Sequence, residues 1–301
     1  MEIDNGDLFP KISEDEVLYI IGNGFDIAHN IESKYSDFEK WCRNNKHDTG
    51  IFDALFSTKE DFWGNLEEAL GNYDEKTIMD FCKPDDEFDM DHSLSSSAKI
   101  EDAPMSVLKP ALDGLKTYFN EWVDSISLLG IEPFLKLYRN AKYLTFNYTE
   151  TLEKIYNIPR TNICHIHGNR LIKNHNCIFG HNNYREEIAH DEDLLLFEEN
   201  AYLSIFQYFN EFVKPIQSNI SRNFSFFNSL KNIKLVYVLG HSLSEIDMPY
   251  FDYLLSLFTV QPKFIFSSNS RIDTINISGF VKKKGINHHK IIDLEDLNKA
   301  M

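Results

Sequence analysis

The stretch VLYIIGNGFDIAHN at residues 17–30 contains the local pattern on which the fold rests. Its five apolar residues Val17–Ile21 have the length of a buried strand and are far too few for a membrane helix. Gly22 and Gly24 follow directly, and a helical segment begins near Asp26. A buried strand, a glycine turn and a helix in this order are typical of a parallel α/β sheet.

Comparable apolar runs recur along the chain, and several are separated by segments with helical spacing. Phe251, Leu254, Leu255 and Phe258, for example, fall at i, i+3, i+4 and i+7. The pattern predicts a mostly parallel, Rossmann-like α/β sheet with helices on both faces. The further strands are expected at Lys142–Phe146, Asn162–Ile166, Lys234–Leu239, Lys263–Phe266 and Lys290–Ile292.

More than a hundred residues separate the first two expected strands, which is too long for one crossover. We expect a single α/β domain over residues 1–301 with a helical insertion at about 50–140. Within it, Phe62–Leu70 and Leu108–Leu129 have helical texture. Residues 83–104 between them are acidic and Ser-rich, so they are expected to form a mobile loop.

The composition excludes several functional classes. Lys plus Arg number 30 against 47 Asp plus Glu, a net charge of −17, which disfavours general nucleic-acid binding. Four scattered cysteines do not describe a disulfide scaffold. The acidic N-terminus lacks the pattern of a secretory signal, and no apolar run could span a membrane, so a cytoplasmic protein is expected.

The first candidate site is the glycine turn itself, Gly22, Asn23, Gly24, Phe25 and Asp26. Glycines at such a turn let a phosphate approach the N–H groups of the following helix. The third glycine of the dinucleotide fingerprint is replaced by Ile27, and no P-loop Lys is present. An ordinary strand-to-helix turn is the alternative.

The second candidate site combines Asn147, after one expected strand, with His167 and Gly168, after the next. Ligands bind at the carboxyl ends of parallel strands. Asn147 can hold a water or a ribose hydroxyl, and His167 can take a proton near neutral pH. A helix cap and a core histidine are the alternatives for each alone, but their pairing favours a site.

The nearby cysteines and histidines are possible ligands of a metal ion. These residues do not form two chelating pairs, so no metal is expected. They are Cys164, His165, His167, His175, Cys177 and His181.

The third candidate site is Gly240-His241-Ser242-Leu243-Ser244, followed by Asp247. It approximates a G-x-S-x-G nucleophile elbow, but Ser244 replaces the last glycine. Asp273 with His288 or His289 would have to complete a triad. A polar loop that binds a ligand through Gly240, Ser242 and Asp247 is the preferred interpretation.

With these clusters in place, the chain resembles the AbiH family of bacteriophage abortive-infection proteins. The resemblance covers about residues 20–251. Its matching pieces are IIGNGFDIAHNIESKYSDF at 20–38, Trp63 with Glu67, TFNYTETLEKIY at 145–156, HIHG at 165–168, IFGHN at 178–182 and LGHSLSEIDMPYF at 239–251.

A more distant resemblance, to sirtuins and sirtuin-like NADases, implies a mechanism. By it, Asn147 and His167 would be catalytic in cleavage of NAD, and the glycine turn with Ser242 would hold the dinucleotide. Thr149 departs from the pattern, which has an acid there, although Asp26 or Glu67 could supply the carboxylate. Backbone amides after Gly24 would bind the phosphates of this anionic ligand.

The resulting expectation is a phage-defence NAD hydrolase with Asn147, His167 and Asp26 as catalytic residues. Its partner is a small nucleotide, and a homo-oligomer or a partner defence protein is compatible with it. A nucleotide-sensing module without turnover, a serine hydrolase using Ser242 and an interaction scaffold are the alternatives.

Overall fold

The chain divides into two compact units. An α/β unit comprises Met1–Ser33, Ile126–Asn176 and Pro215–Met301, and a helical unit comprises Lys34–Ser125 and Cys177–Lys214. The structure is a computed structural model, and it describes residues 12–56, 61–83, 93–170, 177–186, 194–294 and 296–300.

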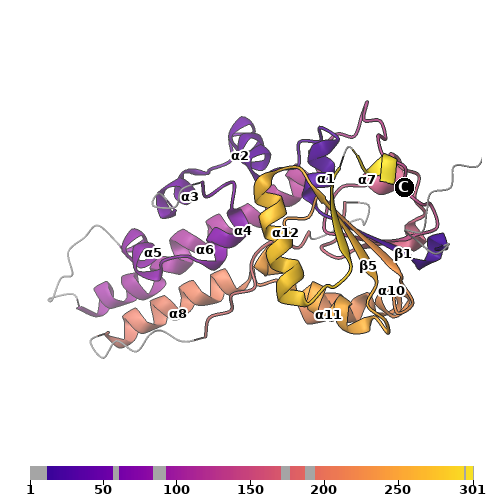
Figure 1. Cartoon of the computed structure of the whole chain (residues 1–301). Coiled ribbons are helices and arrows are strands. Elements are labelled where there is room, and N and C mark those ends of the chain that lie inside the picture. The colour runs from indigo at the N-terminus through magenta and orange to yellow at the C-terminus, as the bar shows by residue number, and fades with distance from the viewer. Residues whose placement is uncertain are drawn as a thin grey trace, which may run out of the picture. The chain divides into compact units, whose positions relative to one another are not determined.

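A six-stranded sheet forms the centre of the α/β unit (Figure 1). All its strands are parallel, in the order β3-β2-β1-β4-β5-β6. This confirms the Rossmann-like α/β prediction. The strands are β1 Val17–Ile21, β2 Lys142–Thr145, β3 Ile163–His165, β4 Leu235–Leu239, β5 Lys263–Ser268 and β6 His289–Asp293.

Strand β1 lies between β2 and β4, and this is where the strand order reverses. In the register, Ile21 at the end of β1 faces Thr145 of β2 on one side and Leu239 of β4 on the other. Ligands of open α/β sheets bind at the carboxyl ends of the strands at such a switch point. All three candidate clusters of the sequence follow β1, β2, β3 or β4 at this end.

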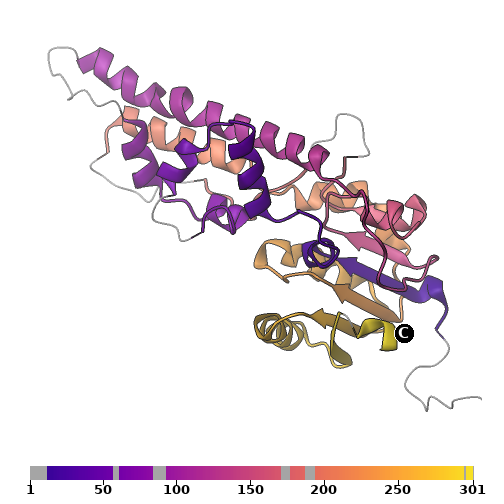
Figure 2. The same ribbon diagram turned by 90° about the horizontal axis from the view of Figure 1, so that it is seen from above.

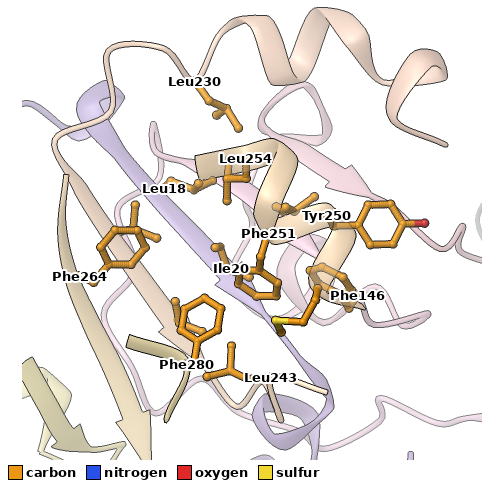
Figure 3. Close-up of a cluster of buried hydrophobic side chains, with 14 of the residues drawn as sticks. Leu18, Ile20, Phe146, Leu230, Leu243, Tyr250, Phe251, Leu254, Phe264 and Phe280 are labelled. Atoms are coloured by element: carbon orange, nitrogen blue, oxygen red, sulfur yellow. The ribbon is translucent and has the colours of Figure 1, made fainter. Parts of the chain in front are cut away.

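The two faces of the sheet bury separate cores because alternate residues of β1 point to opposite sides. Leu18 and Ile20 pack with Phe251 and Leu254 on one face (Figure 3). On the other face, Tyr19 lies with Phe25 and the other members of the second core cluster.

Helices cover both faces, as predicted. Side chains of α9, α10, α11 and α12 belong to the first core cluster, and those of α1, α7 and α13 to the second. Their bounds are α1 Asn23–Ala28, α7 Thr151–Lys154, α9 Ile216–Arg222, α10 Phe224–Asn228, α11 Met248–Leu257, α12 Arg271–Lys284 and α13 Leu297–Ala300.

The helical unit is built around an aromatic core and the paired helices α6 and α8, which lie side by side (Figure 2). The Phe119 ring contacts the rings of Phe38, Trp122 and Phe179, and Tyr73 stacks on Phe209. The helices are α2 Tyr35–Asn44, α3 Gly50–Leu55, α4 Leu66–Gly71, α5 Glu75–Cys82, α6 Ser93–Ser125 and α8 Leu196–Asn210.

The predicted mobile loop at 83–104 was wrong for residues 93–104, which form the first turns of α6. Packing against α8 outweighs the weak helix propensity of this Ser-rich segment: Ala103 is buried, and Asn200 donates a hydrogen bond to Glu101 at 3.0 Å. Residues 84–92 lie outside the described residues. Most of the expected insertion falls in the helical unit, while the single-domain expectation stays a prediction.

Two further features concern disulfide bonds and membrane-spanning helices. Cys42, Cys82, Cys164 and Cys177 are free thiols, each buried. Across the described ranges, every helix is too short or too polar to cross a membrane.

Candidate functional site

The turns after β1 and β4 pack backbone against backbone. The Gly22 N–H donates to the Leu239 carbonyl at 3.0 Å, and the Gly24 N–H donates to the Gly240 carbonyl at 2.8 Å. A Cβ on Gly22 would come within 2.5 Å of the His241 Cα, and one on Gly240, where φ is +63°, within 2.1 Å of the Phe25 nitrogen. The glycines therefore permit this close contact.

This packing uses groups that the sequence suggested for a phosphate. Besides the Gly24 N–H, the Phe25 N–H is bonded, to the Gly22 carbonyl at 3.0 Å. The Asn23 side chain is tied to Ser33 by two hydrogen bonds, and the Phe25 ring is buried in the core. The turn thus brings Gly22–Phe25 against Gly240, while the side chains of Asn23 and Phe25 serve the local structure.

Asp26 is the residue of this turn with an unusual environment. It is completely buried, and the Thr149 hydroxyl donates to its Oδ2 at 2.5 Å, while Thr149 is itself 3.0 Å from the Thr151 hydroxyl. Burial raises the pKa of Asp26, and the nearby side chains of Thr149, Thr151 and Asn147 partly oppose that rise. Its Oδ1 has no hydrogen-bond partner in the described part of the chain.

The contact with Asp26 accounts for the departure at Thr149. The sequence has a threonine where the sirtuin pattern has an acid, but Asp26 of α1 places a carboxyl group against that threonine. The other carboxylate considered, Glu67, belongs to the helical unit, where it is 3.0 Å from the Lys214 Nζ. Asp26 is therefore the better candidate for the missing acid.

Asn147 follows β2 at the same end of the sheet. Its side chain is buried, and neither amide atom has a hydrogen-bond partner among residues that the structure describes. Its backbone is held firmly: the N–H donates to the Thr145 hydroxyl at 3.1 Å, and the carbonyl accepts from His165 Nδ1 at 3.2 Å. The side chain is thus positioned but not satisfied.

His165 and Glu153 also belong to this site, although the sequence indicated no role for either beside Asn147. The His165 Nε2 lies 3.0 Å from Glu153 Oε1, so the carboxylate orients the ring that contacts the Asn147 carbonyl. Their spacing in sequence carried no signal of this pairing, because it depends on the short α7 returning to the end of β3.

His167 lies with Asp247 and His241, a group supplied by the segments after β3 and β4. The His167 Nε2 is 3.7 Å from Asp247 Oδ1, and the His241 Nε2 is 3.9 Å from Asp247 Oδ2. The Leu243 N–H donates to His241 Nδ1 at 3.0 Å, which leaves the His241 proton on Nε2, toward Asp247. His241 is thus a second site residue that the sequence analysis left without a role.

Gly168 shapes the turn after His167. Its φ is +81°, a region that glycine adopts without strain, and its N–H donates to the His165 carbonyl at 3.2 Å. The glycine therefore places His167 by a tight turn at the end of β3.

Ser242 does not lie in a triad. Its side chain is exposed, and the hydrogen bonds of the described residues include none that joins it to a histidine or a carboxylate. Asp273 instead caps α12, accepting from the Asn269 N–H at 3.1 Å. The geometry thus gives no support to the serine-hydrolase alternative.

The residues weighed as metal ligands are distributed between the two units. Cys164, His165 and His167 belong to the α/β unit, whereas Cys177 and His181 belong to the helical unit. The His181 Nε2 donates to the Phe209 carbonyl at 3.1 Å. His175 lies outside the described residues.

Two clusters of polar side chains therefore lie at the carboxyl ends of the strands. Asp26, Thr149 and Asn147 form one, and His167, Asp247 and His241 form the other. Phe146 joins them, because it precedes Asn147 in the chain and its ring contacts both histidines, with centroids 5.3 Å and 4.4 Å away. The arrangement supplies a carboxyl, an amide and a histidine–carboxylate pair on one sheet edge.

Comparison with known proteins gives one match. The family described as bacteriophage abortive infection AbiH matches residues 18–267. No curated protein and no solved structure matches the chain.

Proposed function

Because the chain belongs to the AbiH family of bacteriophage abortive-infection proteins, we propose that it acts in phage defence by binding NAD or a related nucleotide and cleaving the nicotinamide–ribose bond. The site would be the carboxyl ends of β1, β2, β3 and β4. One observation carries the proposal: Asp26 Oδ1 and both amide atoms of Asn147 are buried without hydrogen-bond partners in the described part of the chain.

Such atoms are costly to leave unsatisfied. A buried polar group without a partner destabilises a fold by about 1–3 kcal/mol. Three such atoms at a switch point require an explanation, and hydrogen bonds to a ligand or to an ordered water that a ligand displaces would supply one. A ribose, whose hydroxyls both donate and accept, matches one carboxyl oxygen and one amide.

The residues divide the proposed chemistry among them. Cleavage passes through an oxocarbenium-like state, which the Asp26 carboxylate would stabilise. Asn147 would orient a ribose hydroxyl or the attacking water, and His167 would accept a proton, with Asp247 stabilising the imidazolium so formed. Glu153 and His165 are positioning residues, since they act through the backbone of Asn147.

The protonation state of Asp26 predicts how the rate of hydrolysis changes with pH. Burial raises the pKa of Asp26, so its neutral form persists to higher pH than usual. The reaction needs the ionised form, and the positive charge of oxidised nicotinamide favours it. The rate of hydrolysis is therefore expected to rise with pH through the raised pKa.

A second candidate function, nucleotide sensing without turnover, is favoured by a different observation. The Gly24 N–H, the donor expected to hold a phosphate, is already bonded to the Gly240 carbonyl. The phosphates of a dinucleotide would then be held by groups other than the glycine-turn amides that the sequence indicated. A nucleotide held in this way would be bound but not cleaved.

The test measures nicotinamide release from NAD by the purified protein and by Asp26→Asn, Asn147→Ala and His167→Ala. Each substitution is expected to lower the rate about 100-fold or more. Asp252→Asn is the matched control, because Asp252 is an exposed carboxylate of α11 that pairs with Lys284 of α12. Unchanged NAD, even in extracts of phage-infected cells expressing the wild type, would reject hydrolysis, and thermal stabilisation by NAD without nicotinamide release would select the sensing function.

A further inference from the structure

Strand β6 ends the sheet, and the direction of its outer hydrogen-bonding groups follows from the register. The Phe264 N–H donates to the His288 carbonyl at 2.9 Å, while Phe264 is in register with His289. In a parallel pair, a residue bonds to the neighbours on either side of its register partner. Residues 288, 290 and 292 therefore turn their backbone groups toward β5.

It follows that the N–H and C=O groups of His289 and Ile291 and the N–H of Asp293 point away from the sheet, while the Asp293 carbonyl already accepts from the Asp296 N–H at 3.1 Å. In the strand order, β6 has β5 as its one neighbour among the described strands. The yellow strand at the lower margin of the sheet in Figure 2 is this edge. An edge of this kind is a template for pairing with another strand.

The side chains of the same three residues share one face. Ile291 packs against the first core cluster, so His289 and Asp293, two positions away on either side, point to that face as well. His289 and Asp293 are exposed, and Ile291 is half-buried. The edge thus presents a basic residue, an apolar residue and an acidic residue in that order.

We propose that a second copy of this chain binds along this edge, β6 against β6, antiparallel and centred on Ile291. In this antiparallel register, each residue whose backbone groups face outward lies opposite another such residue of the second copy. Ile291 then meets Ile291 of the second copy on the two-fold axis. His289 lies opposite Asp293 of the second copy, and the two-fold axis repeats this pair, so an imidazole that can donate a hydrogen bond faces a carboxylate at both ends of the edge.

The charge of the whole chain does not oppose this association locally. Two copies at −17 repel each other at long range, and salt screens that repulsion beyond about 8–10 Å. In β6 and directly before it, however, the exposed side chains of His288, His289 and Lys290 are basic. Lys290 points to the opposite face from His289 and lies opposite Ile292 of the second copy.

The test is the mass of the full chain in solution, by light scattering, for the wild type and Ile291→Pro. The wild type is expected at twice the mass of one chain. Ile291→Pro removes an N–H that faces outward and leaves the bonds to β5 intact, so it should give a folded monomer with unchanged circular dichroism. A monomeric wild type, or a dimeric Ile291→Pro variant, would overturn the proposal.

A second measurement holds even where the proline variant fails to fold. Ile291→Cys places two thiols across a hydrogen-bonded antiparallel pair, where Cα atoms are about 5.5 Å apart, within the range of a disulfide. Mild oxidation should cross-link this variant into a covalent dimer. The matched control Lys290→Cys lies opposite residue 292 and should remain unlinked; the reverse pattern contradicts the register.

Discussion

Two carboxyl groups, a half-buried one in the helical unit and a fully buried one in the α/β unit, differ in how their oxygens are bonded. Glu67 of the helical unit accepts from the Lys214 Nζ at 3.0 Å and from the Gly180 N–H at 3.0 Å. Asp26 of the α/β unit accepts from the Thr149 hydroxyl, and its other oxygen has no partner in the described part of the chain. The Glu67 carboxylate is thus bonded by groups of its own unit, whereas Asp26 Oδ1 can still accept a hydrogen bond from a ligand.

This difference in bonding suggests different roles for two segments that both carry the family resemblance, 178–182 and 145–156. The segment around Gly180 and His181 serves the Glu67 cluster: a Cβ on Gly180 would lie 2.0 Å from the Phe212 carbonyl oxygen, and His181 bonds the Phe209 carbonyl. We therefore assign the segment 178–182 to the stability of the helical unit. The segment around Asn147 is the one that we propose binds a ligand.

The largest expected effect is on the satisfied pair. The Lys214 side chain is almost completely buried, so Lys214→Met would remove the cation that faces the Glu67 carboxylate. We expect a loss of about 3 kcal/mol in the free energy of unfolding, measured by urea denaturation. The double variant Glu67→Leu/Lys214→Met should recover most of it, and a double variant as unstable as Lys214→Met would show that the pairing is not the cause.

A smaller loss is expected where the two turns of the α/β unit meet. Gly240→Ala adds a Cβ against the Phe25 nitrogen at a residue with φ of +63°, so the free energy of unfolding should fall by about 2–3 kcal/mol. Gly279→Ala is the control, because Gly279 is inside α12 with no atom within 4 Å of an added Cβ. That change should stabilise by about 1 kcal/mol, and equal effects at the two glycines would contradict the packing described.

The two units also contain a matched pair of buried histidines with a predictable pH response. Burial lowers the pKa of His29 and of His181 below the usual 6.5, so both are neutral in the folded chain. The unfolded chain therefore takes up these protons first as the pH falls below 6.5, and stability declines by at most about 1.4 kcal/mol per histidine per pH unit. Above that pH, they contribute no slope.

Urea denaturation between pH 8 and pH 5.5 measures this response. His29 donates through Nδ1 to the Phe25 carbonyl and accepts from the Tyr156 hydroxyl through Nε2, both at 2.7 Å. His29→Gln keeps a polar side chain without the titration, so it should flatten the decline relative to the wild type. A variant with the full wild-type slope would exclude His29 as a source.

Much of the fold was predictable from the sequence because it rests on local patterns. The runs at Val17–Ile21 and Lys234–Leu239 are buried on both faces, so they are continuous apolar stretches that periodicity identifies as strands. The start of α6 was not predictable in this way. Its Ser-rich residues are helical through packing on α8, which no local pattern encodes.

The candidate site was predictable as a set of positions but not as a set of contacts. Strand ends indicated Asp26, Asn147, His167 and Asp247, because parallel strands bring their carboxyl ends to one edge. The pairing of Asp26 with Thr149 joins residues 123 positions apart, and that of Glu153 with His165 needs the return of α7. Such pairings depend on tertiary structure, and so does the bond that occupies the Gly24 N–H.

The smallest change in stability carries the most direct test of the contrast between the two carboxyl groups: thermal unfolding of Asp26→Asn and the wild type, each with and without NAD. If Asp26 is retained for a ligand, the neutral amide should raise the free energy of unfolding without NAD by about 1 kcal/mol. The same variant should lose the stabilisation that NAD gives to the wild type. An Asp26→Asn variant that is less stable than the wild type and equally stabilised by NAD would contradict the assignment of this carboxyl group to function.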